Sequence, residues 1–121
     1  MAATIATLES VSAPGFHNDL NNKSTKLQEG IEKALADAGV QASIAGFPGF
    51  IHVGLGLIEK PREYRDLIAI DKERYRTFCH EMLKRGVRAL ERGAWFISST
   101  HTDDILDETI AAAREAAKEI T

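Results

Sequence analysis

Histidine, cysteine and serine are the side chains whose spacing would reveal a metal or nucleophile site, and here they are scattered. The four histidines, His17, His52, His80 and His101, stand far apart, and none has a histidine four residues away on the same helix face. Cys79 and His80 are adjacent, so on a helix their side chains diverge by about 100° and do not pair as nucleophile and base. The sequence therefore predicts no metal site and no nucleophile–base pair, and Cys79 is interpreted as a core residue.

The glycines of Gly46-Phe47-Pro48-Gly49 do not have the spacing of a phosphate-binding loop. A P-loop ends in Lys-Ser/Thr, and a dinucleotide fingerprint needs its glycines between a strand and a helix; neither pattern is present. Ser98 and Ser99 also lack a base at a recognisable spacing. From the residues alone, this is a domain without catalytic apparatus.

Three helices are predicted from apolar residues at three- and four-residue spacing. The first covers Phe16 to Ala38 and ends at Gly39, while Asp71 and Thr102 are the expected N-caps of the other two. The residues expected to face the core from the last two helices are Tyr75, Phe78, Cys79, Met82, Leu83, Ile105, Leu106, Ile110, Ala113, Ala117 and Ile120.

The expected strands are Gln41–Ala45, Ile51–Leu57 and Ala94–Ser98, with further extended structure at Val87–Leu90 and a turn over Gly46–Phe50. In the second strand, alternation puts Ile51, Val53, Leu55 and Leu57 on one face, and His52, Gly54 and Gly56 on the other. A glycine-lined face predicts close approach by a backbone or a ligand. The predicted class is α+β, with helices on one face of a small, mostly antiparallel sheet.

Length, net charge and cysteine count limit the classes of function that this chain can have. A length of 121 residues suits one domain, and a net charge of -3 gives no footprint for nucleic acid or an anionic membrane. The single cysteine excludes an internal disulfide, and no signal peptide or membrane-spanning run is recognisable. These features predict a cytoplasmic protein that binds neither nucleic acid nor membrane.

Several segments, in this order, resemble the C-terminal domain of class III aminotransferases, and most closely the branch of glutamate-1-semialdehyde 2,1-aminomutases. They are Met1-Ala2-Ala3 through Thr7-Leu8-Glu9, Gly46–Phe50, Tyr64-Arg65-Asp66, Asp71, Tyr75–Phe78, Met82–Val87 and Phe96–Asp104. The resemblance covers nearly the whole chain, and the ordered set is more specific than any single piece.

This resemblance implies a fold-type I enzyme that uses pyridoxal phosphate (PLP). Residues 1–13 would be the helix leading out of a large domain, and residues 14–121 the small C-terminal domain that closes over the substrate cleft. The large domain, the implied partner, would hold the Schiff-base lysine; no lysine of this chain lies in the family's loop around that residue. The chain alone is therefore expected to bind no PLP and to have no transaminase activity.

The resemblance also implies substrate-pocket candidates: Phe47, Pro48 and Gly49 in the turn, and Arg92, Gly93 and Trp95 before and in the last strand. Arg92 could bind a carboxylate through its planar fork, or be a surface arginine paired with an acid such as Glu91. Trp95 could wall the pocket or belong to the core. No catalytic, cofactor-binding or metal-ligating residue is assigned.

The chain departs from the aminomutase branch at one of these candidates. That branch has a glutamate three positions before the phenylalanine matching Phe96, where this chain has Gly93. The difference favours a related aminotransferase over the aminomutase reaction.

The alternative interpretation is a free-standing, non-catalytic α+β module that serves binding or dimerisation. In either case, apolar residues of the N-terminal helix, mainly Ile5 and Leu8, are expected to promote homo-oligomers when no large domain covers them.

Overall fold

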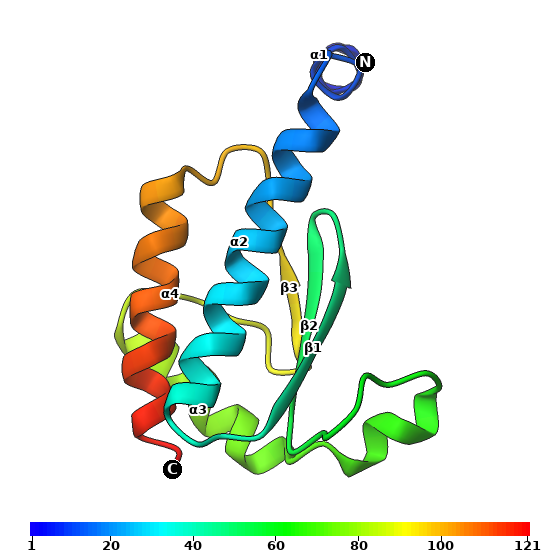
Figure 1. Cartoon of the computed structure of the whole chain (residues 1–121). Coiled ribbons are helices and arrows are strands. Elements are labelled where there is room, and N and C mark those ends of the chain that lie inside the picture. Colours follow the sequence, from blue (N-terminus) through cyan, green and yellow to red (C-terminus); the bar gives the residue numbers. More distant parts are fainter.

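The computed structural model describes residues 1–121 as four α-helices, a 3-10 helix and one antiparallel sheet with strand order β1-β2-β3 (Figure 1). In chain order the elements are α1 (Ala2–Val11), α2 (Phe16–Asp37), β1 (Ala42–Phe47), β2 (Phe50–Leu55), η1 (Tyr64–Ala69), α3 (Lys72–Lys84), β3 (Ala94–Phe96) and α4 (Asp103–Lys118). The α+β class is confirmed. None of the helices is long and apolar enough to cross a membrane.

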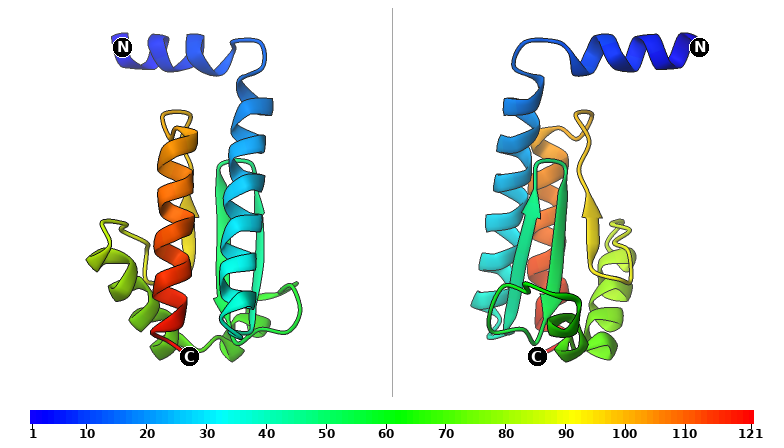
Figure 2. Two further views of the ribbon diagram at one scale, coloured as in Figure 1. Left: turned by 60° about the vertical axis from the view of Figure 1, so that its left-hand side comes forward. Right: turned by 90° about the vertical axis from the view of Figure 1, so that its right-hand side faces the viewer.

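The helices α2, α3 and α4 lie on one face of the sheet, and the other face is open around the hairpin tip, as the second view in Figure 2 shows. At the far end of that open face, Leu57 covers Gly54 and η1 lies near His52. The long helices α2 and α4 pack side by side behind the strands, and α3 packs against α4 and β2. The sheet and the helices α2, α3 and α4 share a single core. Its largest buried side chains are Ile31, Leu35, Ile44, Ile51, Val53, Leu55, Tyr75, Phe78, Met82 and Leu106. The predicted arrangement of helices on one face is thus confirmed.

The predicted helix ends are formed by the expected residues. The Asp71 carboxylate accepts a hydrogen bond from the Arg74 N–H at 3.0 Å, and the Thr102 hydroxyl accepts one from the Ile105 N–H at 3.3 Å. Each satisfies one of the first-turn donors that a helix leaves unpaired. Gly39 follows α2 with φ +72°, a conformation that glycine adopts without steric cost.

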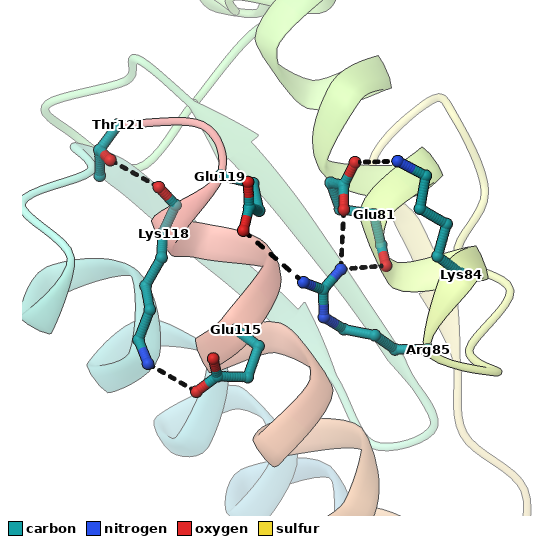
Figure 3. Close-up of polar contacts among 7 residues, drawn as sticks. All are labelled: Glu81, Lys84, Arg85, Glu115, Lys118, Glu119 and Thr121. Carbon is teal, nitrogen blue, oxygen red and sulfur yellow. Dashed lines mark hydrogen bonds and ion pairs between the residues drawn. The ribbon is translucent and has the colours of Figure 1, made fainter.

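Polar groups fasten α3 to α4 at one end of the molecule (Figure 3). The Arg85 guanidinium lies 2.8 Å from the Glu81 carboxylate in α3 and 3.9 Å from Glu119. Hydrogen bonds from Lys84 and Arg85 hold the pKa of Glu81 below its usual value. Nearby, Arg74 donates from Nε to the Ile120 carbonyl at 2.7 Å, which joins α3 to the end of the chain.

The β1–β2 hairpin is tighter than expected. Only Pro48 and Gly49 form the turn, and Phe47 and Phe50, placed in the turn by the sequence, are instead the last paired residues of the two strands. Gly46 permits this close pairing, because a Cβ there would lie 2.7 Å from the Ile51 Cα.

Three further expectations were wrong. Leu57 is buried, but Gly56, with φ +83°, interrupts the alternation, so Leu57 covers Gly54 on the other face of the sheet. Leu83 and Ile105 are 55% and 43% exposed, since they lie at the edges of the buried stripes of α3 and α4. Val87–Leu90 forms no strand of the sheet.

One buried hydroxyl joins three segments that are distant in sequence. Tyr75 Oη in α3 accepts a hydrogen bond from Trp95 Nε1 in β3 at 2.8 Å and donates to the Leu90 carbonyl at 3.0 Å. The Leu90 carbonyl also accepts from the Gly93 N–H at 3.2 Å, so the end of the Val87–Leu90 segment is held by α3 and by the loop before β3. Burial raises the pKa of the Tyr75 phenol, so the neutral donor is the form in the fold.

The Tyr75→Phe variant tests this hydroxyl. We expect a loss of about 1–2 kcal/mol in the free energy of unfolding, because the buried Trp95 N–H loses its acceptor. The Leu90 carbonyl still accepts from the Gly93 N–H at 3.2 Å. Urea unfolding followed by circular dichroism measures the loss. Tyr64→Phe is the matched control, since Tyr64 is 81% exposed and makes no hydrogen bond; equal losses for the two variants would contradict the assignment.

Candidate functional site

The helix-free face of the sheet carries a row of aromatic side chains. Register places Phe47, Phe50 and Phe96 beside one another across the three strands, and alternation puts all three on the side away from the helices. Phe47 and Phe96 are 76% and 66% exposed, and the rings of Phe50 and Phe96 lie 5.3 Å apart between centroids. We call these three residues the aromatic row.

The predicted candidates Phe47, Pro48 and Gly49 lie at the hairpin tip, next to the aromatic row. The tip is braced from both sides: Gly49 N–H donates to the Ser24 hydroxyl of α2 at 2.7 Å, and its carbonyl accepts from Ile97 N–H at 2.9 Å. The backbone of the turn is therefore held in place while the Phe47 ring faces outward.

Arg92 and Gly93 lie at another level of the sheet. Gly93 stands opposite Val53, whose N–H donates to the Gly93 carbonyl at 2.8 Å, and Val53 is about 10 Å along β2 from Phe50 at roughly 3.3 Å per residue. Both residues line a cavity of about 640 Å³ that also includes His52. Arg92 is exposed and makes no ion pair, so the expected alternative of a pair with Glu91 is not what the structure shows.

The backbone conformation at position 93 explains why this residue is a glycine. Its φ is +86°, and a Cβ there would lie 2.8 Å from both His52 Nε2 and the Val53 carbonyl oxygen. A side chain such as the glutamate of the aminomutase branch would therefore not fit this loop.

Trp95 lies on the opposite side of the sheet, in the core. It is 7% exposed, stacks on Phe78 at 6.5 Å between ring centroids, and donates to Tyr75. The six sequence candidates thus form three groups: the hairpin tip, the 92–93 loop and one core residue. The structure does not bring them into a single cavity.

Sequence reasoning placed His52 on the face opposite the core but missed Phe50 and Phe96 as its neighbours there. The signal was the two-residue alternation, which places Phe50 and His52 on one side of β2. It was not used for Phe50, because that residue was assigned to the turn.

The polar residues between β3 and α4 serve the geometry of the chain. His101 Nδ1 accepts from Ser98 N–H at 2.9 Å, and the hydroxyls of Ser98 and Thr100 lie 2.6 Å apart. Cys79 is buried, which raises the pKa of its thiol. No group of three His, Cys, Asp or Glu side chains is placed to hold a metal ion.

The lysines of the chain do not fit a Schiff-base role. That role needs a desolvated amine in a pocket, whereas five of the seven lysines are exposed and the half-buried Lys23 and Lys26 are held in ion pairs of 3.0 and 2.9 Å with Asp19 and Asp107. The lysines of this chain therefore do not fit covalent binding of PLP.

The loop glycine is testable by substitution. We expect Gly93→Ala to cost about 2–4 kcal/mol in the free energy of unfolding, the sum of a left-handed backbone and a clash with Val53. Gly86→Ala is the matched control: its φ is +84° but nothing lies within 4 Å of its Cβ position, so only about 1 kcal/mol should be lost. Similar losses in chemical denaturation would show that the clash is absent.

Known proteins share both sequence and fold with this chain. It is 36% identical over 124 residues to the glutamate-1-semialdehyde 2,1-aminomutase of Desulfatibacillum aliphaticivorans and 37% identical over 123 residues to that of Leptothrix cholodnii, covering 99% and 95% of this chain and 28% of each relative. The PLP internal aldimine form of the Sphingopyxis sp. MTA144 FumI protein has the same fold, with a TM-score of 0.80 and 21% identity over 98% of this chain and 26% of that one. No family model matches the chain.

The chain thus spans little more than a quarter of these relatives. The antiparallel sheet and its helices have the same fold as part of the solved FumI structure. In sequence and in fold, the chain corresponds to the C-terminal portion of class III PLP-dependent aminotransferases and aminomutases.

Proposed function

We propose that this chain is the cleft-closing small domain of a PLP-dependent class III aminotransferase and works against a large, cofactor-binding domain. The observation that carries the proposal is the bare sheet face with its aromatic row, because contiguous exposed apolar surface marks a place where another surface packs. A cytoplasmic location is part of the proposal, as the chain has a single free thiol and no disulfide.

The exposure of helix α1 is a second, independent observation that favours a large partner domain. It contains one charged residue, Glu9, buries none of its side chains, and projects away from the core (Figure 2). Its large apolar side chains Ile5 and Leu8 are 53% and 61% exposed, so they are free to pack on another surface. We propose residues 1–13 as the helix that leads out of the large domain and residues 14–121 as the small domain.

The substrate-pocket candidates divide by role in this proposal. The Phe47–Gly49 tip and the aromatic row would face the large domain, while Arg92 would offer its guanidinium to a substrate carboxylate. Trp95 would support β3 from the core through its bond to Tyr75. PLP, when bound by the large domain, supplies the electron sink for amino-group transfer.

The first test compares the chain alone with a chimera. The purified chain with added PLP and amino donors should show no amino-group transfer, because no lysine occupies a desolvated pocket. A chimera in which this chain replaces the matching portion of the Leptothrix cholodnii enzyme should bind PLP and transfer amino groups. The absorbance of the cofactor measures both.

Variants of the chimera locate the contact. Phe96→Glu should abolish or strongly reduce activity, because it places a charge in the aromatic row. Ile58→Glu is the control, since Ile58 is 81% exposed and outside the row. Amino-group transfer by the isolated chain would contradict the proposal. A folded, PLP-bound but inactive chimera would favour the free-standing module.

Self-association is the second test. Ile5 and Leu8 are 53% and 61% exposed on α1, so the isolated chain should form dimers or larger species at high concentration. The double variant Ile5→Glu with Leu8→Glu should restore the monomer in analytical ultracentrifugation, whereas Ile58→Glu should not. A wild-type chain that stays strictly monomeric would refute this prediction.

A further inference from the structure

We infer that the outer edge of β3 binds a short extended peptide segment of another protein, with apolar side chains at alternate positions, as a fourth strand of the sheet. The edge opens on a cavity of about 310 Å³ between β3, the Val87–Leu90 segment and the first half of α4. The inference concerns the backbone of β3 and the side of the sheet, so it does not rest on the proposed function.

The register shows which main-chain groups of β3 have no strand partner. On either side of the strand the chain bonds toward the β1–β2 hairpin: the Gly93 carbonyl accepts from β2 at 2.8 Å, and Ile97 N–H donates to the Gly49 carbonyl at 2.9 Å. Main-chain groups of alternate residues point the other way, so those of Ala94 and Phe96 point toward the cavity, which both residues line. Because β3 pairs with β2 alone, two N–H and two carbonyl groups remain for another strand.

The opposite edge of the sheet is covered by a helix. The second view in Figure 2 shows α2 alongside β1, and Gln28 of α2 donates from Nε2 to the Ile44 carbonyl, an outward group of β1, at 3.5 Å. The chain thus covers one edge of its sheet and leaves the other at an apolar cavity. An uncovered edge is a template for pairing with another strand.

The lining of the cavity sets the kind of segment. Leu27, Trp95 and Leu106 are buried in its walls, whereas Leu90 and Ile105 line it with 45% and 43% of their surfaces exposed. Alternate apolar side chains of an added strand can pack among these residues while its main chain bonds to β3. In this mode of recognition main-chain hydrogen bonds provide affinity and side-chain pockets provide specificity. A helix would not serve, because its main-chain groups are already paired.

The experiment is a titration of the 121-residue chain with the peptide acetyl-Thr-Val-Thr-Val-Thr-amide, followed by amide chemical shifts and hydrogen exchange. We expect saturable shifts along β3 and slower exchange of the Ala94 and Phe96 N–H groups, because the peptide carbonyls accept from them. The control peptide has the same side chains but a methyl group on every main-chain nitrogen, so it donates no hydrogen bond. Its Kd should be at least about tenfold higher. No saturable shift, equal binding of the methylated peptide, or protection confined to β1 would overturn the inference.

Two substitutions at position 96 isolate the main-chain donor. Phe96→Ala removes the ring and keeps the N–H, whereas Phe96→Pro removes both. Because this N–H points away from β2, proline costs the sheet no hydrogen bond. We expect a Kd for the unmethylated peptide at least about threefold higher with Phe96→Pro than with Phe96→Ala; equal values would contradict the edge pairing. Thermal unfolding checks that both variants are folded, and if Phe96→Pro is not, the exchange of the Ala94 and Phe96 N–H groups in the unaltered chain decides.

Discussion

Burial of one face of a three-stranded sheet is the constraint on which the other elements depend. Ile44, Ile51, Val53 and Leu55 present that face, and α2, α4 and α3 are placed by the need to remove it from water. Because the helices cover one side only, apolar side chains such as Phe47 and Phe96 stay exposed on the opposite face. The bare face and the aromatic row are therefore products of the same packing that stabilises the core.

Local signals in the sequence were sufficient for helices and caps. Asp71 and Thr102 act through atoms three residues away, so their roles depend little on the rest of the fold. Leu57 was misplaced because a left-handed backbone at Gly56 interrupts the alternation, and periodicity alone carries no information on that angle. The bond between the Leu90 carbonyl and the Tyr75 hydroxyl could not be predicted, because Tyr75 is distant in sequence.

The candidate site was predictable only in pieces. The resemblance agrees with the relatives that the comparisons find, but it grouped Arg92 and Gly93 with Phe47–Gly49 and Trp95, which the register and the two faces of the sheet keep apart. The lack of an ion pair between Arg92 and Glu91 was also hidden, because adjacent residues of a loop need not point their side chains together. Electrostatics of this kind is a property of the folded surface.

The brace at the hairpin tip has a mechanical consequence. Because Ser24 and Ile97 hold Gly49 from two sides, the tip, α2 and the segment after β3 form one rigid unit. The backbone between α1 and α2 is different: Gly15, with φ +85°, has no atom within 4 Å of its Cβ position, and α1 packs mainly on α2. Because α1 contributes no buried residue, rotation of the backbone at Gly15 would change the angle between α1 and the rest of the chain while the contacts of the core are kept.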